Sequence, residues 1–374
     1  MPLYLDYAAT QPMRQCAIDA WTQAASSLNP GASYASGRKA RSVLDDARET
    51  VAELLGCEPI EVIFTSSGTE ADNIAIQGLF RAASDTTPRI VSTPIEHPAV
   101  LETVEKLHAG HGATVELMPV DSTGHVSDLS ALETPAALAT CMWANNETGA
   151  IQPVADITER AAAHNTPVHI DAVQVAGKLP INFHELGATT LAASAHKFGG
   201  PRGIGLLLAR RTPAPLPLAF GGGQERGIRP GTVDVASASA LAAALRESVA
   251  EMEQEDTRLS ALRDKLRVGI ESSIDNVIIN SAEPTLASHL HVSFPGTDGD
   301  SLIMLLDAAG IEASAGSACH AGVNRMSHVL EAMGIDEEHG RGSLRFTLGR
   351  LTTDEDIDAV LTELPEIIRR ARSV

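Results

Sequence analysis

Lys197, a candidate nucleophile, lies in the segment SAHKFGGPRGIG (194–205), where an apolar stretch is followed by a glycine-rich turn. A lysine that is buried as a cation at the end of a strand is costly. Such surroundings lower the pKa of the amine, and a neutral amine can attack a carbonyl to form a Schiff base. Lys197 is therefore a candidate Schiff-base residue, and the alternative is a surface lysine on a strand-to-loop turn.

A carboxylate occupies the apolar segment HIDAVQ (169–174). The alternation of a strand places Asp171 and Val173 on one face. A carboxylate in such a strand needs a cationic partner, and an aspartate paired with a protonated pyridine nitrogen turns that ring into an electron sink. Asp171 is therefore a candidate partner for a pyridine ring, with a strand-end aspartate that caps a loop as the alternative.

The segment TSSGTEADNIAI (65–76) ends a predicted strand and begins a helix at Thr69 and Glu70. Free N–H groups and hydroxyls at the N-terminus of a helix form a site for phosphate. Many helices begin with Ser or Thr as ordinary caps. This segment therefore indicates a phosphate site only in combination with the other two.

These segments must be positioned by strands and helices that alternate along the first two thirds of the chain. Apolar residues at helical spacing predict a helix over 38–55. Short apolar runs predict strands at 61–66, 89–95, 114–120, 137–144, 168–173, 190–195 and 203–209. Such alternation implies parallel strands joined by crossover helices. The expected fold class is α/β, with a mostly parallel mixed sheet covered by helices.

The pattern changes after the glycine-rich segment GGGQERGIRPGT (221–232). The sequence then predicts a long helix, two short strands and two further helices, at 234–274, 276–280, 290–294, 299–309 and 354–372. We interpret residues 15–245 as a large domain. Residues 1–14 and 246–374 are interpreted as a smaller α+β domain.

The composition excludes several classes of protein. The 374 residues are 44% hydrophobic and 20% charged, which is typical of a globular protein of about two domains. A net charge of −20 disfavours nucleic-acid binding. The four cysteines show no CxxC or paired spacing, which argues against a disulfide scaffold or a metal centre. We find no secretory signal and no apolar run long enough for a membrane helix, so we expect a cytoplasmic protein.

In this order and spacing, the three segments resemble the fold-type I pyridoxal-phosphate enzymes, and more closely the cysteine desulfurases of the NifS and Isc type. Other segments with counterparts in that family are YLDYAATQP (4–12), NPGASYASGRKAR (29–41), IEHPAV (95–100), NNETGAIQPV (145–154), GGGQERGIRPGT and LRFTLGR (344–350). The resemblance covers essentially the whole chain. It implies the large and small domains of that fold, with pyridoxal 5'-phosphate as cofactor.

The resemblance implies a role for several residues around the cofactor ring. Lys197 would hold the cofactor as a Schiff base and later move the Cα proton of the substrate. His97 would stack on the face of the ring. Asp171 would pair with the pyridinium nitrogen, and Gln174 would hydrogen-bond the ring hydroxyl.

The same resemblance implies contacts with the phosphate and the substrate. The phosphate would be held by Gly68, Thr69, Ser194 and His196, and by Thr232 of the neighbouring subunit in an obligate homodimer. Asn146 would lie near the ring hydroxyl and the substrate carboxylate. Arg345 would bind that carboxylate, because a guanidinium fork suits two oxygens. Arg350 is the less favoured choice.

Cys319 lies in EASAGSACHAGVNRMSHVL (312–330), whose small residues predict a mobile loop at about 312–325. By itself a loop cysteine is more often incidental than catalytic. The resemblance implies that Cys319 is the nucleophile, which takes sulfur from L-cysteine as a persulfide and leaves L-alanine. An acceptor protein, such as an iron–sulfur scaffold or a tRNA-thiolation enzyme, would then receive the sulfur. A thiolate needs a nearby proton acceptor or cation, for which His320 and His97 are candidates.

The chain departs from the family at four points. His320 follows the nucleophile, where common members have a hydroxyl residue. Gln224 and Tyr34 replace frequent histidines. The chain ends 24 residues after Arg350, without the longer tail by which housekeeping members dock their scaffold. We expect activity, and leave delivery to a scaffold open.

The same residues are compatible with other enzymes of this fold and with a non-catalytic protein. A selenocysteine lyase would use the same site and stays open, whereas an aminotransferase has no use for a loop cysteine. A non-catalytic binding protein is a further alternative. It is disfavoured by the simultaneous presence of a Schiff-base lysine, a ring-pairing aspartate, a stacking histidine, a carboxylate-binding arginine and a loop cysteine.

Overall fold

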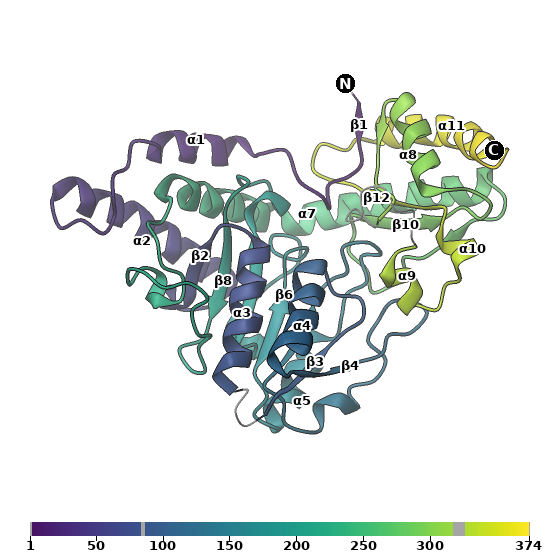
Figure 1. Ribbon diagram of the computed structural model, residues 1–374. Coiled ribbons are helices and arrows are strands. Elements are labelled where there is room, and N and C mark those ends of the chain that lie inside the picture. Colours follow the sequence, from purple (N-terminus) through teal and green to yellow (C-terminus); the bar gives the residue numbers. More distant parts are fainter. Residues whose placement is uncertain (1, 84–86, 317–325, 374) are drawn as a thin grey trace.

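The computed structural model describes residues 2–83, 87–316 and 326–373. Its centre is a seven-stranded sheet in the order β2-β8-β7-β6-β5-β3-β4 (Figure 1). The strands are β2 (Val62–Thr65), β3 (Arg89–Ser92), β4 (Thr114–Leu117), β5 (Leu138–Met142), β6 (Val168–Asp171), β7 (Thr190–Ser194) and β8 (Gly205–Ala209). Strands β4, β3, β5, β6 and β7 run parallel, while β8 is antiparallel to both β7 and β2. The predicted mostly parallel mixed sheet is confirmed.

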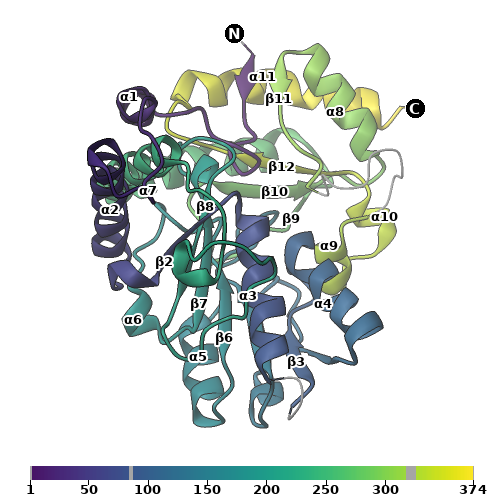
Figure 2. The same cartoon turned by 60° about the vertical axis from the view of Figure 1, so that its left-hand side comes forward.

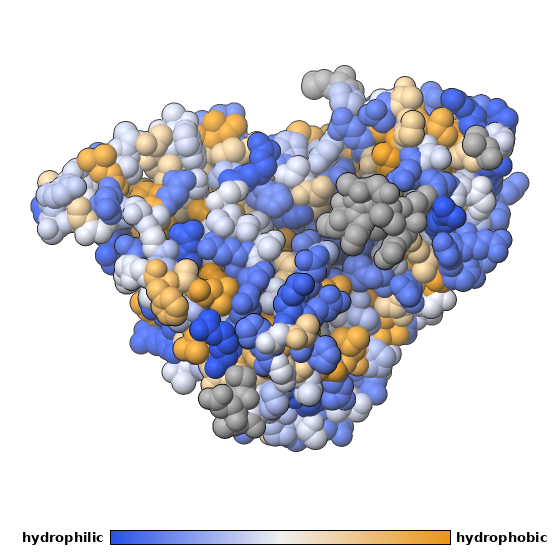
Figure 3. All heavy atoms as spheres, in the orientation of Figure 1, coloured by the Kyte–Doolittle hydropathy of each residue, from blue (hydrophilic) through white to orange (hydrophobic). Residues whose placement is uncertain are grey.

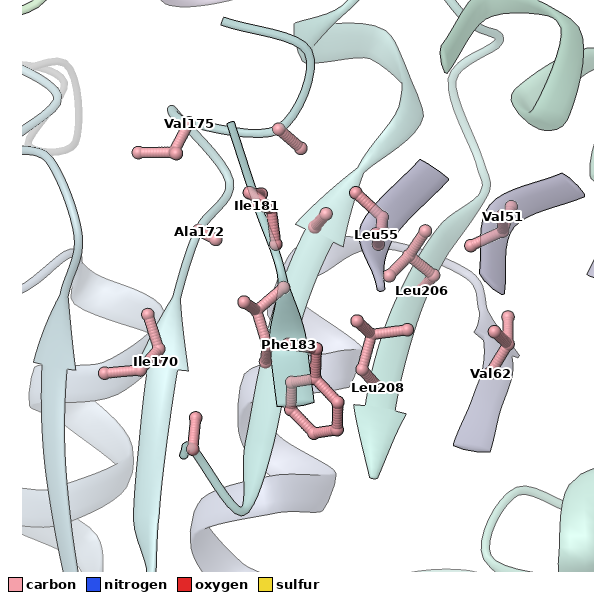
Figure 4. Packing of buried hydrophobic residues seen from close by; sticks show 14 of the residues in the cluster. Val51, Leu55, Val62, Ile170, Ala172, Val175, Ile181, Phe183, Leu206 and Leu208 are labelled. Atoms are coloured by element: carbon pink, nitrogen blue, oxygen red, sulfur yellow. The ribbon is translucent and has the colours of Figure 1, made fainter. Parts of the chain in front are cut away.

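Helices cover both faces of this sheet because its strands are apolar on both sides. One face carries α1 (Gln15–Ala24), α2 (Ala35–Leu55), α5 (Val154–Ala163), α6 (Phe183–Leu186) and the first half of α7 (Val235–Ser273). The other face carries α3 (Gly68–Ala83) and α4 (Pro98–His111). Strand β8 shows the alternation directly: Leu206 and Leu208 pack toward α2 (Figure 4), whereas Leu207 packs under α3.

A second, smaller part of the chain is built around a three-stranded antiparallel sheet. Its strands are β9 (Ile278–Ile279), β10 (His289–Ser293) and β12 (Ser343–Thr347), in the order β12-β10-β9. A separate pair joins β1 (Leu3–Tyr4) to β11 (Ile311–Glu312) in parallel. The helices are the second half of α7, α8 (Gly299–Ala308), α9 (His328–Ala332), α10 (Glu337–Gly340) and α11 (Asp354–Ala371). In Figure 2 this part lies directly above the central sheet.

The two parts have separate apolar cores. The core of the smaller part includes Leu5 from the N-terminal segment together with residues of β10, β12, α8 and α11. The first residues of the chain thus pack with residues between 259 and 371. The boundaries at 14/15 and 245/246 stay a prediction, because α7 runs through the second of them without interruption.

The long helix α7 connects the two parts. Asp234 caps its N-terminus by accepting a hydrogen bond from the backbone N–H of Ser237. The helix packs against α1 and α2 at one end and against α11 at the other. None of the helices in the described part of the chain is long and apolar enough to cross a membrane.

Candidate active site

A cavity of about 300 Å³ opens at the carboxyl ends of β6 and β7, next to the N-termini of α3 and α4. Open α/β sheets bind their ligands at this edge. The cavity lies between the central sheet and the smaller part, because residues of both line it. The predicted site residues among its lining are Gly68, Thr69, His97, Asn146, Asp171, Gln174, Ser194, His196, Lys197 and Arg345.

Lys197 ends a short 3-10 turn, η3 (Ala195–Lys197), that directly follows β7. Its Nζ donates hydrogen bonds to the backbone carbonyls of Ala8, at 2.5 Å, and Ala9, at 2.9 Å. Burial and the nearby Arg345 guanidinium lower the pKa of Lys197 to about 8, against the opposing pull of Asp171 and Asp6. A substantial fraction of the amine is therefore neutral near pH 8, the form that can act as a nucleophile or accept a proton.

Asp171 is the last residue of β6, and its side chain is buried. Its Oδ1 accepts a hydrogen bond of 2.9 Å from the backbone N–H of Val173. Burial raises the pKa of Asp171, while the positive charges of His97 and Lys197 oppose the shift. No arginine or lysine among the described residues forms an ion pair with this carboxyl group. A cationic nitrogen in the cavity would supply the missing partner.

His97 caps the N-terminus of α4, where Pro98 is the first helical residue. Its Nδ1 accepts a hydrogen bond of 3.1 Å from the backbone N–H of Ala99. Burial is the main cause that lowers the pKa of His97. The hydrogen bond fixes the orientation of the ring and leaves the proton of the neutral form on Nε2.

One end of the cavity is formed by the N-terminus of α3. A Cβ on Gly68 would lie 2.7 Å from Cγ2 of Val173, so this position has room only for glycine. The small residue allows a ligand to approach the backbone at the start of the helix, where the N–H of Glu70 already donates to Oγ of Ser67. His196 reaches the same region with its Nδ1 3.2 Å from Oγ1 of Thr10. Burial lowers the pKa of His196 to about 4, so the ring is neutral.

Arg345 enters the cavity from β12 of the smaller part. Its Nη1 donates to the backbone carbonyl of Asn146 at 2.9 Å, and its Nη2 forms an ion pair of 2.5 Å with Asp6. Its Nε has no hydrogen-bond partner within the described chain. Arg350 lies outside this cavity, where its Nη2 contacts the backbone of Pro12 and Met13. Of the two arginines, Arg345 is the one placed to bind a ligand carboxylate in the cavity.

Two predicted site residues do not appear in the cavity. Thr232 is exposed and lines a separate hollow beside α2, so its expected contact with the phosphate of a neighbouring subunit stays a prediction. Cys319 lies outside the described residues. Gly316, just before that gap, lines the cavity.

The first residues of the chain form part of the site, which the sequence analysis did not foresee. Besides accepting from Lys197, the carbonyl of Ala8 accepts from Nε2 of Gln174 at 3.0 Å. The backbone N–H of Ala8 donates to Oγ1 of Thr347 on β12 at 2.9 Å. The motif YLDYAATQP was visible in the sequence, but nothing local indicated that its backbone carbonyls cap the lysine.

Two further buried carboxyl groups lie near Asp171 and were also missed. Asp72 of α3 lies 3.1 Å from Nε2 of His169. Glu96 accepts hydrogen bonds from Oγ1 of Thr93, at 2.9 Å, and from the backbone N–H of Met142, at 3.0 Å. Burial, followed by the charge of Asp171, raises the pKa of both, to about 8 for Glu96. Glu96 is therefore largely protonated at neutral pH.

A family model described as Aminotransferase class-V matches residues 3–360. The chain belongs to the class-V aminotransferase family. Within this family it is similar to an IscS-like cysteine desulfurase of Mycobacterium tuberculosis, with 46% identity over 99% of this chain and 97% of that protein. The chain thus belongs with the cysteine desulfurases of the IscS and NifS type, as the sequence motifs indicated.

Solved structures agree with this assignment. A NifS-like protein superimposes with a TM-score of 0.92 and 36% identity, covering 99% of this chain and all of that one. A structure described as SspA in complex with cysteine gives a TM-score of 0.80 and 31% identity, covering 92% of this chain and 98% of that one. The fold of this class-V chain is therefore that of the NifS-like proteins along its whole length.

Proposed function

We propose that this protein is a pyridoxal-phosphate-dependent cysteine desulfurase that converts L-cysteine to L-alanine and carries the sulfur as a persulfide on Cys319. The observation that carries the proposal is the placement of Lys197, Asp171, Arg345 and the α3 N-terminus around one cavity. The full-length similarity to cysteine desulfurases supports the reaction. The neighbour described in complex with cysteine supports the substrate.

The residues of the cavity fit pyridoxal phosphate at three points. The buried carboxyl of Asp171 forms no ion pair with an arginine or lysine among the described residues and suits a pyridinium nitrogen. The α3 N-terminus, with glycine where a Cβ would clash, suits a phosphate. Lys197 suits the aldehyde carbon. The bound cofactor would supply an electron sink for the pair released when the Cα–H bond of the substrate breaks.

The chain's own groups would divide the remaining work. Lys197 would move the Cα proton at Nζ, for which a pKa of about 8 is well placed. Arg345 would bind the substrate carboxylate and fix the amino acid in the cavity. His97, held by its hydrogen bond to Ala99, would cover the ring face and exclude water.

Sulfur transfer would use the Cys319 thiolate. Its attack on the substrate sulfur forms an S–S bond while the C–S bond breaks, and the electron pair of that bond stays with the substrate. Protonation of the carbon fragment then gives L-alanine. The thiolate form is required, so a proton acceptor must lie near Cys319 when it attacks.

We further propose that the enzyme is a homodimer, in which Thr232 of one subunit reaches the phosphate of the other. The arm formed by α1 and α2 projects from the body (Figure 1) and carries several hydrophobic side chains on its surface (Figure 3). Exposed large hydrophobic side chains between residues 15 and 55 include Trp21, Leu28 and Tyr34. A dimer interface would cover such residues. We propose that the sulfur acceptor is a protein of iron–sulfur assembly or tRNA thiolation. We also propose a cytoplasmic location, because the four cysteines are not spaced as in a disulfide scaffold.

The test is production of sulfide and alanine from L-cysteine in the presence of a reductant. We expect equal amounts of both and a cofactor absorbance band that shifts when substrate is added. Cys319→Ala should abolish sulfide release and keep the band. Cys57→Ala, as a matched control, should retain both. Sulfide release by Cys319→Ala would refute the persulfide assignment, and a band without sulfide in the wild type would point to another amino acid as substrate.

A further inference from the structure

Lys178 is a cation next to the active site to which the proposed mechanism gives no task. It follows β6 by seven residues, and the amine of its partly buried side chain donates a hydrogen bond of 3.2 Å to Oε1 of Gln174. Within the described residues the amine of Lys178 forms no ion pair and has no other hydrogen-bond acceptor. Since an unpaired cation removed from water is costly, the contact with Gln174 calls for a functional reason.

Several ionisable groups lie near Lys178. Burial, followed by repulsion from Lys197 of η3 and Arg345 of β12, lowers the pKa of Lys178 to about 7. The other ionisable groups near it are His289 of β10, which its charge affects in turn, and Arg14, Glu255, Asp256 and Arg350, which line the same small cavity. If Lys197 is linked to the carbonyl of the cofactor, the positive charge on its nitrogen would be offset by the ring oxygen that shares its proton, so its repulsion of Lys178 would weaken. The ammonium form of Lys178 is then favoured.

The contacts of Gln174 fix the orientation of its amide. Oε1 faces the Lys178 amine, which donates, and Nε2 faces the carbonyl of Ala8, which can only accept. A flipped amide would set two acceptors against each other at Ala8 and two donors against each other at Lys178. The orientation is therefore determined, and the second N–H of Nε2 is left for a ligand in the cavity that Gln174 lines.

We propose that Lys178 is a positioning residue, which holds Gln174 with an N–H toward the ring oxygen of pyridoxal phosphate and places a positive charge behind it. This inference rests on the proposed cofactor. The donor suits an anionic ring oxygen, because a hydrogen bond from a donor polarised by a cation is stronger than one between neutral groups. Lys178 itself touches neither cofactor nor substrate and acts through Gln174.

The test compares Lys178→Met with Lys265→Met, which removes a lysine from the exposed side of α7. Cofactor-free Lys178→Met should bind pyridoxal phosphate about tenfold more weakly, the value of one hydrogen bond to a charged group. The proton shared between the ring oxygen and the Lys197 nitrogen should leave at a pH about one unit higher. The sign follows because loss of that proton leaves a negative charge, which the Lys178 cation stabilises. Absorbance titrations measure both quantities, and Lys265→Met should change neither.

Thermal unfolding separates positioning from a merely structural role. Cofactor-free Lys178→Met should be as stable as the wild type or more so, because it removes a poorly solvated cation. A structural lysine would give a lower melting temperature. In a Gln174→Ala background, Lys178→Met should have no further effect on cofactor affinity or on the pH midpoint.

Three results would overturn the inference. The first is a Lys178→Met protein with wild-type affinity and midpoint. The second is an undiminished effect of Lys178→Met in the Gln174→Ala background, which would show that the lysine acts by another route. The third is a wild-type protein that takes up no pyridoxal phosphate, which would overturn the proposed cofactor as well.

Discussion

The two walls of the active-site cavity are built in different ways. The wall on the central sheet carries Lys197, Asp171 and the α3 N-terminus, each at the end of a strand or the start of a helix. The opposite wall carries Arg345 from the smaller part and the carbonyls of Ala8 and Ala9 from the N-terminal segment. The first wall holds the groups proposed to bind the cofactor. The second holds the arginine proposed to bind the substrate carboxylate, and the carbonyls that accept hydrogen bonds from Lys197. The difference suggests that binding of cofactor and of substrate can be disrupted separately.

The largest effect is expected on the sheet wall. Lys197→Ala should lower alanine formation by about a thousandfold or more, because the substitution removes the group proposed to move the Cα proton. Lys265→Ala serves as the control and should retain full activity. Rates are measured as alanine released at saturating L-cysteine. A Lys197→Ala enzyme that keeps even a tenth of the activity would show that another group moves the proton.

Substitutions in the opposite wall should change the binding of the substrate and leave the binding of the cofactor unchanged. Arg345→Lys should raise KM for L-cysteine by about ten- to a hundredfold, because a lysine cannot form the two parallel hydrogen bonds of a guanidinium with a carboxylate. The affinity of the cofactor-free protein for pyridoxal phosphate should stay the same. Arg350→Lys, outside the cavity, should change neither value. If Arg345→Lys weakened cofactor binding as strongly as substrate binding, the separation of the two walls would fail.

Protonation of Glu96, on the sheet side of the site, should make the free energy of unfolding depend on pH. The pKa of Glu96 is about 8 in the folded protein against 4.5 in the unfolded chain. The folded state thus binds the extra proton between these values, so stability falls as pH rises through this window. Glu96→Gln should flatten that fall by about 1 kcal/mol per pH unit, as measured by urea unfolding. An unchanged pH dependence would mean that Glu96 is ionised in the folded state.

The smallest effect is expected for Thr232, which does not line the active-site cavity of its own chain. Thr232→Ala should weaken cofactor binding by about threefold, the value of a modest hydrogen bond. Mixed dimers, in which one chain carries Thr232→Ala and the other carries Lys197→Ala, show which subunit supplies the threonine to the remaining site. The site that keeps Lys197 would then receive Thr232 from the other chain and should regain wild-type affinity. A persisting loss in the mixed dimer would show that Thr232 serves its own chain.

The strands and turns of the sheet wall could be predicted because their sequence signals are local. Strands 168–173 and 190–195 correspond to β6 and β7, and each carries its functional residue at or just beyond its end. Apolar alternation, glycine-rich turns and helix caps indicate such positions within a few residues. The NifS-like resemblance added the roles of these residues and is confirmed at the level of family and fold.

The opposite wall was less predictable because its geometry depends on distant pairing. The strand β12 was not predicted, since in its SLRFT run Arg345 separates two core residues, Leu344 and Phe346. The register that sets Arg345 opposite His291 arises only when β10 and β12 meet. Lys178, Asp72 and Glu96 had no sequence signal either, because their burial depends on elements far along the chain.

The contact between Asp6 and Arg345 bears on how the enzyme matures during synthesis. These residues are 339 positions apart, as are Ala8 and Thr347, which are also hydrogen-bonded. The sheet wall can form while the ribosome is still translating, since domains fold as units and N-terminal ones first. The opposite wall, with Arg345 and the N-terminal segment that contacts Lys197, can form only after β12 has left the exit tunnel. An emerging chain would thus gain the groups proposed to bind the cofactor well before the arginine proposed to bind the substrate, and a truncated product that stops before β12 would lack Arg345.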